Sequence, residues 1–175
     1  MLNKEELQKM LADLKNEVKN ELRQHDHDGI NSKQIHDINL FGQIKSRIQT
    51  TQQTIATTGN TDFYVIAPIG GFLESVDFSG VDALATSDSA YVTFTITNLG
   101  QLGTGTAVML ATGNTNTTKA TGGSALSANA KRSLLVNSAI NTAQVTAGDR
   151  LLVRAAATGT LANTVTSSMF ILRFK

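Results

Sequence analysis

The pattern of hydrophobic and polar positions changes along the chain, and its first part repeats at heptad spacing. Apolar residues step by four, three and four positions through Leu7, Leu11, Leu14 and Val18, which places them at the a and d positions of a coiled coil. The positions around this seam are mostly charged. The pattern predicts a helix over residues 1–24, either associated with other copies of the chain or lying on its own globular domain. Because so short a helix is marginally stable alone, association between chains is favoured.

From about residue 60 onward the periodicity becomes that of β-strands. Residues 91–98 alternate strictly, with Val92, Phe94 and Ile96 on one side and threonines on the other, as in a half-buried strand. Further short apolar runs lie at residues 63–66, 72–78, 107–111, 134–136, 151–154 and 169–174. Many are separated by turns that contain glycine. About seven or eight strands over some 115 residues indicate a mainly β fold, an antiparallel sandwich with a jelly roll as the favoured topology.

The residues between these two parts form a predicted junction and connector. Gln49 to Thr54 show no apolar periodicity and are interpreted as a linker, and Pro68 predicts a strand end or an edge position. A second short helical or coiled stretch is suggested by the spacing of Ile35, Ile38, Phe41, Ile44 and Ile48. The predicted organisation is therefore a coiled-coil anchoring helix (1–24), a junction (25–58) and a β-sandwich head (59–175).

Composition limits the chemistry and the partners. The formal net charge is +1, so nothing in the overall charge attracts nucleic acid or an anionic membrane surface. The absence of cysteine excludes disulfides, thiolate metal sites and cysteine nucleophiles. No apolar run approaches the roughly 18 residues of a membrane span, and the charged N-terminal residues do not form a signal-peptide core. We therefore expect no nucleic-acid partner and no membrane insertion.

Two of the three histidines lie one residue apart where the heptad pattern ends, in the string His25-Asp26-His27-Asp28-Gly29. His25 occupies the next a position, and Asp28-Gly29 is a turn pair that ends the helical pattern. If the chain becomes extended there, His25 and His27 share a face. Three chains would then supply six imidazole nitrogens, a donor set suited to iron or a similar transition metal, with Asp26 and Asp28 as outer partners. The alternative is a solvated polar turn without a metal.

The histidine string continues as Ile30-Asn31-Ser32-Lys33-Gln34-Ile35, and the whole segment resembles a His-x-His-Asp-Gly-x-x-Ser-x-x-Ile pattern of tailed-phage virion proteins. Such proteins include small fibre, head-fibre and decoration proteins. Residues 92–100 and 147–153 are similar to strands of their Thr/Ala/Gly-rich β-sandwich heads. The resemblance implies a homotrimer in which His25 and His27 hold a metal ion on the threefold axis.

Catalytic patterns are weak. All three histidines precede residue 37, and the acidic residues of the head are few and scattered, so no Ser-His-Asp set or carboxylate pair stands out. The glycine-rich turns lack the lysine of a phosphate loop. Lys131-Arg132 is interpreted as solvated surface rather than a nucleic-acid patch. We expect the protein not to be an enzyme.

The expected function is structural: a short trimeric head fibre or capsid decoration of a phage, anchored through its N-terminal region. It would assemble in the host cytoplasm, reside on the virion surface and contact the major capsid protein or another virion component. The first alternative is a tail fibre or receptor-binding module that recognises a host cell-surface glycan, although the chain has no Trp and two Tyr to form aromatic platforms. The second is an unrelated trimeric binding protein or, less favoured, an enzyme.

Overall fold

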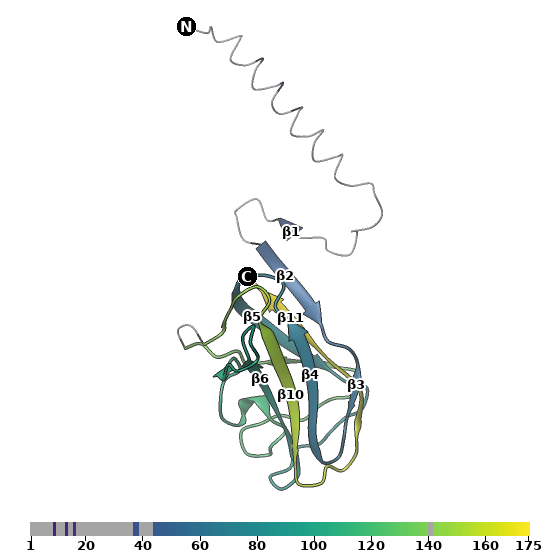
Figure 1. Cartoon of the computed structure of the whole chain (residues 1–175). Coiled ribbons are helices and arrows are strands. Elements are labelled where there is room, and N and C mark those ends of the chain that lie inside the picture. Colours follow the sequence, from purple (N-terminus) through teal and green to yellow (C-terminus); the bar gives the residue numbers. More distant parts are fainter. Residues whose placement is uncertain (1–8, 10–12, 14–15, 17–36, 39–43, 140–141) are drawn as a thin grey trace. The chain divides into compact units, whose positions relative to one another are not determined.

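The computed structural model describes residues 9, 13, 16, 37–38, 44–139 and 142–175 (Figure 1). The chain divides into two units, one ending at His36 and the other comprising Asp37–Lys175. In the first unit, Lys9, Asp13 and Asn16 have helical backbone geometry. Within the described ranges the chain offers no helix with the length and hydrophobicity of a membrane span.

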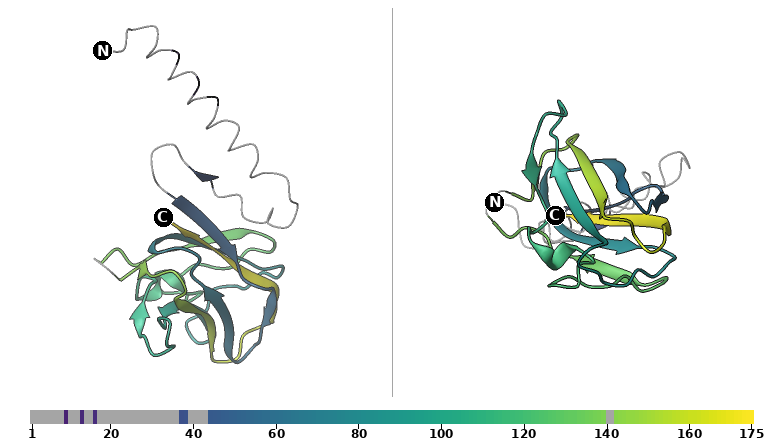
Figure 2. Two further views of the ribbon diagram at one scale, coloured as in Figure 1. Left: turned by 45° about the horizontal axis from the view of Figure 1, so that its top comes forward. Right: turned by 90° about the horizontal axis from the view of Figure 1, so that it is seen from below.

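The second unit consists of two antiparallel sheets stacked face to face (Figures 1 and 2). The larger sheet has the strand order β1 (Asp37–Ile38), β2 (Ile44–Gln49), β11 (Val165–Phe174), β5 (Gly71–Ser79) and β8 (Lys131–Leu134). Two short strands, β3 (Gln53–Ile55) and β9 (Gln144–Val145), pair with β11 and β5. The smaller sheet has the order β4 (Gly59–Ile66), β10 (Arg150–Thr158), β6 (Tyr91–Asn98) and β7 (Ala107–Val108). The prediction of an antiparallel β-sandwich is confirmed.

The core lies between the sheets and is built from the inward residues of alternating strands. In β6, Val92, Phe94 and Ile96 are at most 1% exposed, as the alternation predicts. Phe94 and Phe63 come from the smaller sheet and meet Phe78 and Phe170 of the larger one. The ring centroids are 4.8 Å apart for Phe78 and Phe94 and 5.0 Å apart for Phe63 and Phe170. These four rings join the two layers, since buried aromatic pairs add stabilisation to the area they bury.

The interpretation of residues 44–48 as helical or coiled is wrong. Ile44 and Ile48 lie in β2, which pairs with β11 through Leu172 opposite Ile48. Ile48 faces inward against the core, and its neighbours Lys45, Arg47 and Gln49 are exposed. The segment therefore has the two-residue alternation of a strand. The apolar residues from Ile35 to Ile48 recur every three or four positions, and this spacing led to the interpretation as a helix.

The predicted linker at residues 49–54 also takes part in the sheet. Gln49 ends β2 and Gln53 begins β3. Between them, the Thr50 amide donates to the Phe170 carbonyl at 2.9 Å, and the Thr50 hydroxyl accepts from the Phe170 amide at 3.0 Å. The predicted head boundary at residue 59 thus lies inside the unit that begins at Asp37. Pro68 follows β4 in a turn, as expected for a strand end.

Candidate functional site

The site residues predicted from the sequence lie outside the described residues. These are the metal-site histidines His25 and His27 and the seam residues Leu7, Leu11, Leu14 and Val18. Among the residues that the structure does describe, no three His, Asp or Glu side chains gather in the manner of a metal site. The metal site and the trimer seam therefore stay predictions.

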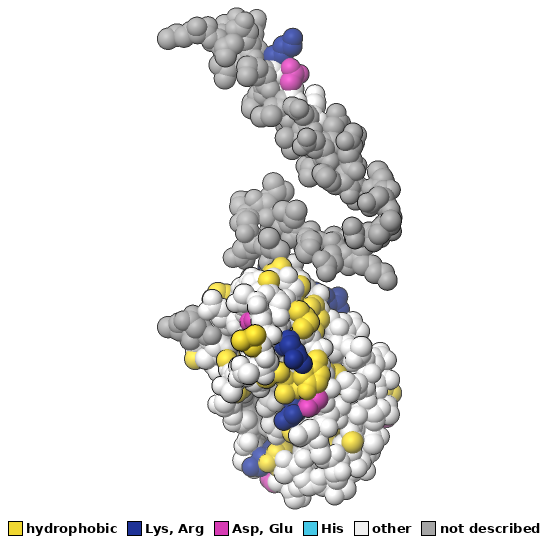
Figure 3. Space-filling model, viewed as in Figure 1, with side chains coloured by type: hydrophobic (Ala, Val, Ile, Leu, Met, Phe, Trp, Pro, Cys, Tyr) yellow, Lys and Arg dark blue, Asp and Glu magenta, His cyan; other side chains and the backbone are white. Residues whose placement is uncertain are grey.

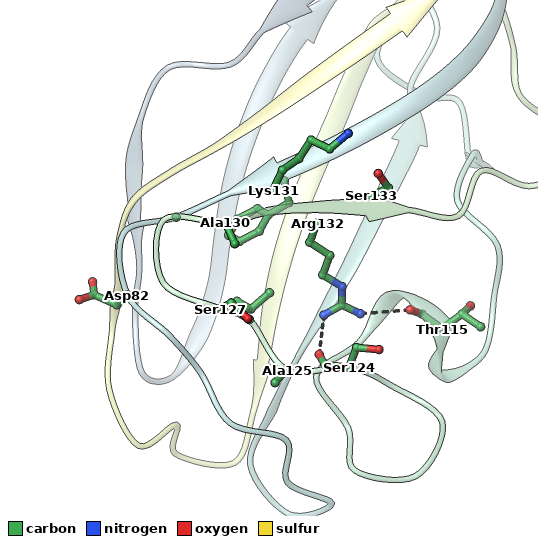
Figure 4. Close-up of a pocket in the computed structure, with 12 residues that line it drawn as sticks. Asp82, Thr115, Ser124, Ala125, Ser127, Ala130, Lys131, Arg132 and Ser133 are labelled. Atoms are coloured by element: carbon green, nitrogen blue, oxygen red, sulfur yellow. Dashed lines mark hydrogen bonds between the residues drawn. The ribbon is translucent and has the colours of Figure 1, made fainter.

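The head itself carries a polar pocket of about 240 Å³ (Figure 4). Its walls come from the end of β5, from the connection that precedes β8, and from β8 itself. The lining residues used below are Phe78, Asp82, Thr115, Ser124, Ser127 and Arg132.

Arg132 is the central residue of this pocket. It alternates with the buried Leu134 and lies opposite Phe78, so it occupies an inward position of β8. Its guanidinium lies 5.7 Å from the centre of the Phe94 ring, within the range of a cation–π contact. A guanidinium thus stands where the strand pattern would place an apolar side chain.

Three backbone carbonyls accept hydrogen bonds from this guanidinium. Nη1 donates to Ser124 at 2.7 Å, and Nη2 donates to Thr117 at 2.7 Å and to Thr115 at 3.1 Å. Burial lowers the pKa of Arg132, because the charged form loses solvation. Within the described part of the chain, no carboxylate forms a salt bridge with it. The hydrogen bonds of Arg132 therefore hold the connection between β7 and β8 against the edge of the sandwich that β8 forms.

A buried asparagine holds the same connection from its other side. Asn116 is 2% exposed and lies in the short 3-10 turn Asn114–Asn116. Its amide donates to the carbonyls of Ala111 and Leu135 at 3.0 and 2.9 Å, and its oxygen accepts from the Leu135 amide at 2.8 Å. With every polar atom paired, the connection is ordered without a ligand.

The interpretation of Lys131-Arg132 as solvated surface is wrong for Arg132, which faces inward. It holds for Lys131, whose side chain is exposed to solvent. The two side chains leave β8 in opposite directions, as neighbours in a strand must (Figure 4). Lys131 is 63% exposed in its side chain and lies 3.4 Å from Asp77. The signal that could have identified Arg132 was its alternation with Ala130 and Leu134, which places it on the core side.

Asp77 is the centre of a second polar cluster, on the outward face of the larger sheet. It is 3% exposed, although it points away from the core. Its carboxylate accepts from Arg173 Nη1 at 2.7 Å and from the Ser133 hydroxyl at 2.8 Å, with Lys131 nearby. Burial alone raises the pKa of Asp77, but the hydrogen bonds and the neighbouring positive charges outweigh it and lower the pKa below its ordinary value. The cluster ties together β5, β8 and β11.

The polar groups at the pocket can also be compared with a catalytic arrangement. Ser124 and Ser127 line the pocket, and the described residues include no histidine that could act as a base for either hydroxyl. Asp82 at the rim already accepts hydrogen bonds from the amide and hydroxyl of Thr166, which lower its pKa.

In comparisons with known proteins, no family model, no curated protein and no solved structure matches this chain.

Proposed function

We propose that this chain is a structural protein of a tailed-phage particle, a short homotrimeric head fibre or capsid decoration that displays a jelly-roll head. The observation that carries the proposal is the sequence segment beginning at His25, which resembles that of phage fibre and decoration proteins. The order of the strands supports the jelly-roll head. The eight principal strands pair as first with last, second with seventh, third with sixth and fourth with fifth. In chain order these pairs are β2–β11, β4–β10, β5–β8 and β6–β7.

This pairing is that of one long antiparallel hairpin rolled into two sheets. The rolled hairpin gives the sheet orders β2-β11-β5-β8 and β4-β10-β6-β7. Jelly rolls of this kind occur in viral capsid proteins and lectins. Because a fold by itself leaves the function open, the N-terminal residues must decide between such roles.

The N-terminal residues favour a trimeric attachment. The seam of Leu7, Leu11, Leu14 and Val18 would join three chains, and the segment beginning at His25 resembles that of phage fibre and decoration proteins. Such a small charged trimer suits a threefold or quasi-threefold position on a capsid lattice, where the partner is the major capsid protein or another virion component. The protein would assemble in the host cytoplasm and reside on the particle surface.

The residues present also fit a structural metal ion. His25 and His27 of three chains supply six imidazole nitrogens, the type of donor that iron and similar transition metals accept, and Asp26 and Asp28 can accept the remaining ring N–H groups. Such an ion would supply cross-linking of the three chains and no reaction.

The test is to add purified, untagged full-length protein to capsids of its phage that lack it, and in parallel to host cells. We expect saturable binding to capsids and none to cells. Cryo-electron microscopy of the decorated capsids should place density at threefold or quasi-threefold positions. Binding to cells alone would contradict the proposal.

The second candidate is a receptor-binding module for a host glycan, and the polar pocket at Arg132 favours it. Serine and threonine residues line this pocket, and their hydroxyls suit hydrogen bonds to sugar hydroxyls. Its aromatic residue Phe78 is only 2% exposed and offers no stacking surface. Cell binding that free sugars abolish would favour this candidate over the first.

A further inference from the structure

The outward face of the smaller sheet carries a row of apolar side chains that no part of the described chain covers (Figure 3). Tyr64, Leu152, Thr97 and Val108 lie directly opposite one another across β4, β10, β6 and β7. Tyr64 is 59% exposed and Val108 is 39% exposed. In the next row Ile66, opposite Arg150, is 53% exposed. We call Tyr64, Ile66, Leu152 and Val108 the apolar patch.

The patch lies toward the end of the head at which the chain enters from residue 36, here called the proximal end. β1 pairs with the start of β2, and Ser46 of β2 pairs with Phe174, which in turn pairs with Leu73 near the start of β5. Ile66 ends β4 and leads through a short turn into that same start of β5. At the other end of the face, the outward residues Asn60, Thr93, Ala156 and Thr158 are polar or small. Tyr91 also lies there, opposite Thr158, and the Lys119 ammonium is 5.6 Å from the centre of its ring.

Charged residues that already have partners border the patch. Arg154 Nε and Nη2 donate to the two oxygens of Asp62 at 2.6 and 2.8 Å, and the Arg150 guanidinium lies 5.8 Å from the centre of the Tyr64 ring. Figure 3 shows apolar side chains on this face with basic and acidic side chains among and beside them. An apolar centre with a polar, satisfied rim is the usual organisation of a protein interface.

The outward face of the larger sheet is different. There the Asp77 cluster occupies the middle, and β2 presents the exposed polar residues Lys45, Arg47 and Gln49. Near the start of β5, Phe72 is 43% exposed on this side. The two faces of the sandwich are therefore unequal, and among the described residues the smaller sheet carries the larger group of apolar side chains.

We infer that the apolar patch is the contact between heads in the trimer, so its occupant is a second copy of this chain. The inference rests on the proposed trimer. His27 and Asp37 are ten residues apart, so a fully extended chain spans at most about 36 Å between them. The proximal ends of three heads joined at the histidines are thus confined near one axis, at an effective concentration of about the millimolar range. At that concentration a small apolar patch is sufficient for association.

The absence of cysteine from the chain allows a direct test by thiol labelling of full-length protein. Tyr64→Cys and Asn60→Cys are matched, since both residues are exposed on the outward face of β4. In the trimer we expect a bulky maleimide to label Tyr64→Cys at least tenfold more slowly than Asn60→Cys. Val108→Cys, a change close in size, should be protected as well and guards against loosening of the contact by the loss of the tyrosine ring.

Light scattering on the same samples separates the two levels of the inference. A trimeric mass with slow labelling at positions 64 and 108 supports the contact. A trimeric mass with labelling at the rate of Asn60→Cys overturns the contact and leaves the proposed trimer intact. A monomeric mass at micromolar concentration overturns the trimer and the contact together.

Discussion

At the scale of single residues, Arg132 takes an inward position that a strand normally gives to an apolar side chain. The cost of burying its charge is offset by three carbonyl acceptors and by the face of Phe94. The acceptors lie 8 to 17 residues earlier in the chain. The residue therefore fixes a long connection in place, which explains why the pocket beside it is preformed.

Asp77 gives the head a pH-dependent stability. Its folded pKa lies below the unfolded value of about 3.9, so its contribution is fully present above that value and is lost as pH falls through the folded pKa. We expect Asp77→Asn to lower the free energy of unfolding by about 1–3 kcal/mol at pH 7. Because the variant no longer has this titrating group, its stability should also fall less steeply between about pH 5 and pH 2.

Urea unfolding at a series of pH values measures both effects. Ser79→Ala is the control, since Ser79 lies on the same outward face of β5 and carries no titrating group. That variant should keep the shape of the wild-type curve. If the Asp77→Asn curve runs parallel to the wild-type curve, the cluster has no part in the acid sensitivity.

At the scale of elements, β6 and β2 show when a local sequence pattern is sufficient to predict a strand and when it is not. Residues 91–97 alternate over seven positions, so the strand and its buried face were both predictable. β2 has six residues, and its two isoleucines also fit the spacing of a helix that begins earlier in the chain. Pairing with β11, more than 120 positions later, selected the strand.

The assignment of residues 44–49 to a strand predicts unequal effects for neighbouring substitutions. Ile48→Asp places a charge against the core and should lower the free energy of unfolding by about 1–3 kcal/mol. Arg47→Asp, on the exposed side of the same strand, should change it by less than about 0.5 kcal/mol. Chemical unfolding of the two variants measures the difference, and equal losses would argue against the alternation.

At the scale of the whole molecule, strand pairing brings together segments that lie far apart in the chain. The first and last principal strands are neighbours, and the Phe72 and Lys175 backbones exchange hydrogen bonds at 2.8 and 3.0 Å. The pairing within the smaller sheet collects the apolar patch from three strands, β4, β10 and β7. In a trimer, contact at this patch and association along the N-terminal seam would reinforce each other, because each contact keeps the three chains close together.

The histidine pair is testable at this scale. Replacing both His25 and His27 by alanine should lower the thermal unfolding temperature and abolish any bound transition metal, because the cross-link between three chains would be lost. Elemental analysis and calorimetry of untagged protein provide the measurements. Wild-type protein without metal, or an unfolding temperature that the double substitution leaves unchanged, would contradict the proposed site.

The sequence alone determined the fold class, the main strand β6 and the location of the turns, because these depend on periodicities within a few residues. Only the tertiary structure decided that residues 44–55 join the sheet, that Arg132 turns inward and that Asp77 is buried on an outward face. Each of these depends on partners far along the chain: Asp77 meets Ser133 at 56 positions and Arg173 at 96. Such contacts arise from strand order, and strand order is set by the packing of the whole core rather than by any local pattern.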